Sequence, residues 1–263
     1  MNNATLVIPH FGDLNKCNYL SLFLATIRNK PFDVLLFTDF DINDVPDNVK
    51  IHKCTIDDIY NRAEKIIGKI ETRFYYKLCD LRVIYGEMFK EELSMYDYWG
   101  WGDLDVMYGQ FENFPKPGNG TPDLFCNYHK RNDMHLVQSE TPVGIWYASG
   151  HFVMMRNDDR SRGLINHLPT AERLIKDKTN RYIDEHLVPT VLMHEFKNVQ
   201  KIHSTDVQYV DVQTVEMRNG AIYANETHLN YLHWYTDKNK IKSIENWRSI
   251  PNNFKLTQYY EST

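Results

Sequence analysis

The sequence predicts an α/β fold in which helices flank a central, mostly parallel sheet. Two short apolar runs near the N-terminus, residues 5–9 and 33–38, have the length and composition of buried strands. Between them, apolar residues recur at helical spacing over residues 17–28, and a strand-helix-strand order is typical of parallel sheets. With 263 residues, of which 42% are hydrophobic, the chain is long enough to bury a substantial core.

The rest of the first half continues this pattern. Residues 49–53 are predicted to form a strand, and residues 56–67 a helix that begins with two acidic residues in its first turn. The clearest helical pattern covers residues 74–89, where apolar residues recur at spacings of three and four. The aromatic stretch YDYWGWGDLDVMYG, residues 96–109, is predicted to follow as an extended strand.

The second half is less regular. Its prolines and glycines make residues 111–122 a predicted loop. Helices are expected at residues 168–176 and 188–196, and strands at residues 123–127, 150–155, 207–212, 221–224 and 231–235, with a polar insertion ending in Trp146 and Tyr147. We find no repeat or linker, so residues 1–263 are expected to form a single domain with an α/β half up to Gly109 and a mixed half over residues 110–263.

Composition excludes several classes of protein. The net charge of -5 argues against a general nucleic-acid-binding protein. Neither a dinucleotide fingerprint GxGxxG nor a P-loop motif occurs in the sequence. No run of about 18 apolar residues predicts a membrane span, and the N-terminus lacks a secretory pattern. The four cysteines form no CxxC pair, so we expect a cytoplasmic protein in a reducing compartment.

Two acids close the aromatic stretch, and they are the strongest candidates for chemistry. In an extended backbone Asp103 and Asp105 point to the same side, while Leu104 points into the protein. Two neighbouring carboxylates repel each other unless a cation lies between them, and Mg²⁺ or Mn²⁺ prefers oxygen ligands. The alternative is a pair of solvated acids at a strand end, but the glycines and tryptophans before them favour a closely packed site.

Other polar residues fall at the ends of predicted strands. Pro9 and His10 end the first strand, and Asp39 follows the second. In open α/β sheets, ligands bind outside the carboxyl ends of the strands. These residues are therefore expected to be neighbours of Asp103 and Asp105, with a divalent cation bridging the oxygens of a pyrophosphate.

Three segments together resemble a known family: YYKLCDLRVIYGEMF, then YDYWGWGDLDVMYG, then GHFVMMRN. They are similar to the DXD-containing GT-A glycosyltransferases of surface-polysaccharide synthesis in bacteria and large algal viruses. The resemblance covers residues 5 to about 242 and is most specific over residues 74–109. It implies a GT-A-like, Rossmann-related domain with a nucleotide-sugar-binding first half and an acceptor-binding second half. If the source is viral, the compartment is the host cytoplasm.

The activity implied by this resemblance is Mn²⁺- or Mg²⁺-dependent transfer of a sugar from a nucleotide sugar to a glycan hydroxyl. The donor is expected to be a UDP-sugar, and UDP-xylose is a guess for an algal-virus-like member. Asp103 and Asp105 match the DXD acids, with Asp105 the stronger metal ligand and Asp103 nearer the ribose. Further matches with nucleotide- or donor-binding positions are Pro9, His10, Phe11, Asp39, Lys77 and Asp80. Lys77 and Asp80, three residues apart, can instead pair with each other.

Three further roles follow from the same resemblance. His233 matches the C-terminal histidine that completes the metal site, and Lys238 and Lys240 would lie near the departing diphosphate. An inverting transfer, which we expect, needs a carboxylate base, and its position is matched by Asp184, which we favour, and by Glu185 as a close second. Asp184 can instead cap the following helix, and a retaining enzyme would need neither acid.

Trp101, Trp146 and Tyr147 are candidates for stacking on sugar rings, although aromatic residues are more often buried in a core. Two other functions remain open. One is a non-catalytic carbohydrate- or nucleotide-binding protein of the same fold, and the other is a metal-dependent phosphoesterase or nucleotidyltransferase. The expected partners are a nucleotide sugar and a glycan acceptor, and the oligomeric state is open.

Overall fold

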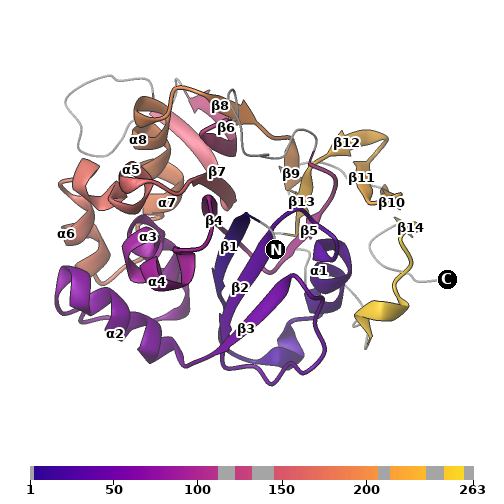
Figure 1. Ribbon diagram of the computed structural model, residues 1–263, viewed down its shortest axis with the longest axis horizontal. Coiled ribbons are helices and arrows are strands. Elements are labelled where there is room, and N and C mark those ends of the chain that lie inside the picture. Colours follow the sequence, from indigo (N-terminus) through magenta and orange to yellow (C-terminus); the bar gives the residue numbers. More distant parts are fainter. Residues whose placement is uncertain (1–2, 112–121, 132–144, 207–213, 235–245, 258–263) are drawn as a thin grey trace. The chain divides into compact units, whose positions relative to one another are not determined.

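The computed structural model describes residues 3–111, 122–131, 145–206, 214–234 and 246–257 (Figure 1). The chain forms two compact units that interleave along the sequence. Unit 1 comprises Met1–Lys53, Gly102–Lys116 and Ile202–Thr263, and unit 2 comprises Cys54–Trp101 and Pro117–Lys201.

The first segment of unit 1 is the predicted strand-helix-strand unit. Strands β1 (Ala4–Pro9), β2 (Asp33–Thr38) and β3 (Val49–Lys53) are parallel and lie side by side in the order β3-β2-β1 (Figure 1). Helix α1 (Leu20–Ile27) connects β1 to β2. Every residue of β2 is buried, as the uninterrupted apolar run predicts.

Unit 1 also contains two smaller sheets. Strands β5 (Val106–Tyr108), β13 (Tyr231–His233) and β9 (Ser204–Asp206) form one sheet in the order β5-β13-β9, with β13 antiparallel to β5 and parallel to β9. The other sheet is antiparallel, in the order β12 (Thr227–Leu229), β11 (Ala221–Ala224), β10 (Thr214–Arg218) and β14 (Phe254–Thr257). The described part of the unit also includes the 3-10 helices η1 (Leu14–Lys16) and η5 (Trp247–Ser249).

Both predicted late strands of this unit, at residues 221–224 and 231–235, are present, the second ending at His233. The four strands β9, β10, β12 and β14 were not predicted. The strand predicted at residues 207–212 lies outside the described residues.

The strands of unit 2 follow the order β4-β7-β6-β8. They are β4 (Tyr98–Gly102, of which Gly102 is assigned to unit 1), β6 (Leu124–Arg131), β7 (Ile145–Arg156) and β8 (Val199–Lys201). Strand β6 is antiparallel to β7 and parallel to β8. The glycine-containing strand β4 packs closely, since a Cβ on Gly100 would lie 1.9 Å from the carbonyl oxygen of Val153. Only glycine fits there.

Helix α2 (Ile56–Ile67) of unit 2 begins and ends where the sequence predicts. A capping box between Thr55 and Asp58 fixes its start. The other helices are η2 (Tyr75–Ile84), α3 (Tyr85–Met88), α4 (Lys90–Leu93), α5 (Asp159–Arg162), η3 (Leu164–His167), α6 (Ala171–Lys176), α7 (Ile183–His186) and α8 (Val188–Glu195).

The prediction of one continuous amphipathic helix over residues 74–89 is wrong. A 3-10 helix, η2, occupies most of the segment, and a separate short helix, α3, follows it. Nor do its charged residues Lys77 and Asp80 face water, because both are fully buried. A segment buried on nearly all sides takes its conformation from tertiary contacts rather than from one apolar stripe.

The described strands confirm the predicted α/β class: β1 with β2, β2 with β3 and β6 with β8 pair in parallel, and β6 with β7 pairs antiparallel. No helix in the described part of the chain is long and apolar enough to cross a membrane.

Candidate functional site

Asp103 and Asp105 lie in a turn, where the sequence predicted a continuous strand. Strand β4 ends at Gly102, and β5 begins at Val106. The chain turns here because β4 and β5 belong to different sheets. Leu104, between the two acids, is 1% exposed, as expected. The turn therefore presents both carboxylates while its apolar residue anchors it in the core.

His233 reaches this turn through the pairing of β13 with β5. In that pairing His233 lies opposite Val106, and the backbone N–H of Trp234 donates to the carbonyl of Asp105 at 2.9 Å. One ligand atom from each of Asp103, Asp105 and His233 lies within 4.8 Å of the other two. The Nε2 atom of His233 is 3.6 Å from Oδ1 of Asp105. The structure thus brings together the three residues predicted to hold a metal ion.

The chemistry of this cluster fits a divalent cation. Asp105 and His233 are buried and Asp103 is half-buried, so their charges are only partly screened by water. Two carboxylates at close range favour a bound cation, and oxygen and imidazole ligands suit Mn²⁺, Mg²⁺ or Zn²⁺. A cation about 2.0–2.6 Å from each atom can bridge a cluster of this size. Asp103, Asp105 and His233 would hold it.

Sequence reasoning did not select Tyr19, which interacts electrostatically with the two acids, or Cys17, which contacts Tyr19. Burial, followed by the negative charge of Asp105, raises the pKa of Tyr19, so its hydroxyl stays protonated. This hydroxyl donates to Sγ of Cys17 at 3.6 Å, and that sulfur lies 3.4 Å from Nε2 of His10. The sequence pattern predicts only that both residues belong to the start of a helix. No local signal therefore marked them as candidates for a functional site.

The predicted nucleoside-binding residues gather at the carboxyl ends of β1 and β2. The backbone N–H of His10 donates to the carbonyl of Phe37 at 2.8 Å, and the imidazole ring of His10 contacts Phe40 edge-on, with centroids 5.5 Å apart. Asp39 accepts a hydrogen bond from the backbone N–H of Gly12 at 3.4 Å. Pro9 is half-buried and Phe11 is buried. The loop after β1 is therefore fastened to the end of β2.

In unit 2, Lys77 and Asp80 form the pair that their spacing allowed. The ammonium of Lys77 donates to Oδ2 of Asp80 and to the carbonyls of Leu174 and Thr179, each at 2.8 Å. Asp80 also accepts from the backbone N–H groups of Arg181 and Ile183. Both side chains are fully buried. Their hydrogen bonds hold the segment before α7 in place, and a role in binding the donor stays a prediction.

Asp184 and Glu185, the predicted bases, lie in the first turn of α7. Asp184 does not cap this helix: the N-cap is Tyr182, in left-handed conformation, and no side-chain cap bond is present. Instead Oδ2 of Asp184 accepts from the guanidinium of Arg82 at 2.6 Å, and Arg82 also donates to the carbonyl of Gly150. A Cβ on Gly150 would lie 2.5 Å from Oδ2 of Asp184 and 2.9 Å from Cγ of Glu185. Both acids therefore pack over this glycine of β7.

The remaining candidates divide between the core and the undescribed parts of the chain. Trp101 is fully buried in β4, so its ring packs in the core. The side chains of Trp146 and Tyr147 lie outside the described part of the structure, as do Lys238 and Lys240 and most of the predicted loop at residues 111–122.

Three solved structures with similar backbones are glycosyltransferases. An active-site mutant of LgtC shares 9% identity, with a TM-score of 0.49 over 88% of this chain and 87% of that one. The galactosyltransferase LgtC in complex with donor and acceptor sugar analogs gives the same identity and coverages and a TM-score of 0.47. A glycosyltransferase involved in glycosylation of the major capsid of PBCV-1 shares 9% identity, with a TM-score of 0.39 over 90% of this chain and 97% of that one.

No curated protein sequence matches the chain. One family model does, and it covers nearly the whole sequence. From its match over residues 6–255, the chain belongs to the family of unknown function DUF6625.

Proposed function

We propose that this protein is a metal-dependent glycosyltransferase that moves a sugar from a nucleotide sugar to a glycan hydroxyl. The observation that carries the proposal is the cluster of Asp103, Asp105 and His233, which we call the acid cluster. Its ligand atoms lie within 4.8 Å of one another. When bound there, a divalent cation supplies positive charge that stabilises a departing nucleoside diphosphate.

The surrounding residues support binding of a nucleotide. His10, at the end of β1, and Asp39, after β2, belong to the same unit as the acid cluster. In α/β folds the carboxyl ends of parallel strands are the usual ligand-binding edge. The hydroxyl of Tyr19 stays protonated under the influence of both acids, so it adds no negative charge to the site.

The proton acceptor is best sought at Glu185. Asp184 is 2% exposed and accepts a hydrogen bond from Arg82, so taking up a proton would disrupt a buried ion pair. Glu185 is half-buried beside it and is more accessible to an acceptor hydroxyl. We therefore assign Asp184 to holding α7 through Arg82, and propose Glu185 as the base of an inverting reaction.

A panel of nucleotide sugars, including UDP-glucose, UDP-galactose and UDP-xylose, tests this function without knowledge of the acceptor. We expect slow release of UDP from at least one UDP-sugar in the presence of Mn²⁺ or Mg²⁺, and none after chelation of the metal. Chromatography of the products distinguishes the reaction classes, because a transferase releases the nucleoside diphosphate.

The opposite outcomes are equally clear. Release of UMP or of a sugar phosphate would assign the site to a phosphoesterase or nucleotidyltransferase. If every donor is inert with both metals while the protein is folded and binds nucleotide, the protein is a binding module of the same fold.

A further inference from the structure

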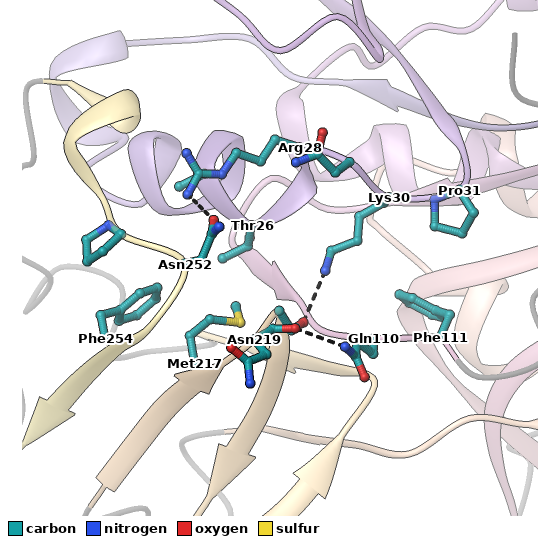
Figure 2. Close-up of a pocket in the computed structure, with 14 residues that line it drawn as sticks. Thr26, Arg28, Lys30, Pro31, Gln110, Phe111, Met217, Asn219, Asn252 and Phe254 are labelled. Atoms are coloured by element: carbon teal, nitrogen blue, oxygen red, sulfur yellow. Dashed lines mark hydrogen bonds between the residues drawn. The ribbon is translucent and has the colours of Figure 1, made fainter.

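Unit 1 contains a cavity of about 560 Å³, a volume within the range of about 300–1,000 Å³ that is typical of small-molecule sites (Figure 2). Its walls come from the end of α1, the segment after β5, the turn between β10 and β11, and the segment leading into β14. We call it the amide pocket, after Asn29, Gln110, Asn219 and Asn252 in its lining.

The amide pocket and the acid cluster lie at opposite ends of the same two elements. Tyr19, which interacts electrostatically with Asp105, directly precedes α1, whereas Arg28 and Lys30 follow its last residue. A helix of eight residues is about 12 Å long. Strand β5 likewise begins after Asp105 and leads to Gln110 at the pocket. The pocket is therefore separate from the proposed metal centre.

Two cations give the amide pocket its charge. Arg28 is anchored by hydrogen bonds from Nη2 to the carbonyl of Ile250 at 2.9 Å and to Oδ1 of Asn252 at 2.6 Å. The ammonium of Lys30 donates to the carbonyl of Gly220 at 3.3 Å. Of the described residues that line the pocket, none is an aspartate or a glutamate. The lining therefore favours a negatively charged occupant.

Amides and aromatic rings complete the lining. The side chain of Gln110 donates to the carbonyl of Asn219 at 2.9 Å, which orders the amide edge of the pocket. Figure 2 shows Phe111 and Phe254 on either side of Lys30 and Asn219. Amide groups both donate to and accept from hydroxyls, and aromatic rings offer an apolar surface to a sugar ring.

We propose that the amide pocket binds an acidic saccharide, with the carboxylate held by Arg28 and Lys30, the hydroxyls by the amide side chains, and the ring against Phe111 or Phe254. This function goes beyond sugar transfer at the acid cluster. None of the residues that carry it is a proposed ligand of the metal or the donor.

Titration of the full chain with glucuronate, glucose and inorganic sulfate tests the proposal. We expect glucuronate to bind saturably, glucose to bind more weakly because it lacks the charge, and sulfate to bind more weakly because it lacks the ring. Replacing Lys30→Gln should weaken glucuronate binding about 10-fold or more, the loss of one charge-assisted hydrogen bond, and Lys30→Arg should retain most of it.

Two controls isolate the pocket. Lys65→Gln makes the same charge change at an exposed position of α2 and should leave glucuronate binding unchanged. Asp105→Asn should also bind glucuronate like the wild type, so that failure of the transferase proposal and failure of this one are distinguishable. A melting curve for each variant shows whether it is folded.

The pH dependence of glucuronate binding is a further test of the proposal. Burial lowers the pKa of Lys30 to about 8, so its positive charge is present below that pH and lost above it. Arg28 keeps its charge, and an adjoining cavity that both cations also line adds Asp47 and Arg248. Glucuronate affinity should therefore fall as the pH rises through about 8 in the wild type and change less in Lys30→Gln.

Three results would overturn the proposal. They are equal affinity for glucose and glucuronate, saturable binding of sulfate with none of glucuronate, and glucuronate binding that Lys30→Gln leaves unchanged.

Discussion

Carboxylates occupy two contrasting environments in this protein. In unit 1, Asp103 and Asp105 lie with His233 in a cluster of ligand atoms within 4.8 Å of one another. In unit 2, Asp80 and Asp184 are more deeply buried, and each accepts a hydrogen bond from a lysine or arginine, at 2.8 Å and 2.6 Å. In unit 1 a carboxylate lies beside another carboxylate, whereas in unit 2 each carboxylate lies beside a lysine or an arginine.

The difference indicates what each region can do. A buried ion pair with further hydrogen bonds is complete within the protein, and it holds its segment in one conformation. Two acids that share a small volume are stabilised by a cation from outside. The same residue type therefore holds the chain in one conformation in unit 2 and forms the proposed metal site in unit 1.

The largest expected effect is on catalysis at the acid cluster. Asp105→Asn keeps the shape of the side chain but removes one negative charge from the proposed metal site. We expect metal-dependent UDP release to fall about 1,000-fold, which corresponds to about 4 kcal/mol. Asp159→Asn, at a fully exposed acid of α5, is the matched control and should behave like the wild type. If Asp105→Asn retains full activity, the acids in the cluster are not metal ligands.

The next largest expected effect is on stability, and it tests the buried ion pair of Lys77 and Asp80 in unit 2. Lys77→Met would leave the carboxylate of Asp80 buried without its ammonium partner, and it also removes two hydrogen bonds to backbone carbonyls. We expect unfolding in urea, followed by tryptophan fluorescence, to show a loss of about 3–5 kcal/mol. Lys65→Met, at an exposed position of α2, should change stability little. A loss of less than about 1 kcal/mol for Lys77→Met would show that the pair is dispensable.

The smallest expected effect is on stability, and it tests the packing of Asp184 against Gly150. A Cβ on Gly150 would lie 2.5 Å from the Asp184 carboxylate, so Gly150→Ala should displace α7 and destabilise the protein by about 1–3 kcal/mol. Ser149→Ala, at the preceding residue of β7, should cost less. If Gly150→Ala is as stable as the wild type, α7 can move, and Asp184 is available for a role other than pairing with Arg82.

Local sequence patterns predicted three early elements of the fold closely. Strands β2 and β3 and helix α2 have the predicted bounds. For α2 a capping box starts the helix, and for β2 an uninterrupted apolar run matches a strand buried on both faces. These signals work because the interactions that define such elements join residues close together in the sequence.

Local patterns gave wrong predictions where contacts between residues far apart in the sequence determine the backbone conformation. A 3-10 helix replaced most of the amphipathic helix predicted at residues 74–89, since its lysine and aspartate are buried against other segments. Asp103 and Asp105 face a common site because the chain turns between two sheets, and not because a strand alternates its side chains.

By itself, then, the sequence determined the α/β class, its main early elements and, through a family resemblance, the identity of the acid cluster. Only the tertiary structure decided that Asp184 pairs with Arg82, 102 residues away, and that Lys30 and Asn219 line one cavity. Such partners are chosen by the burial of charge and by strand pairing across the whole chain. The periodicity of a short stretch of sequence does not indicate which distant residues become partners.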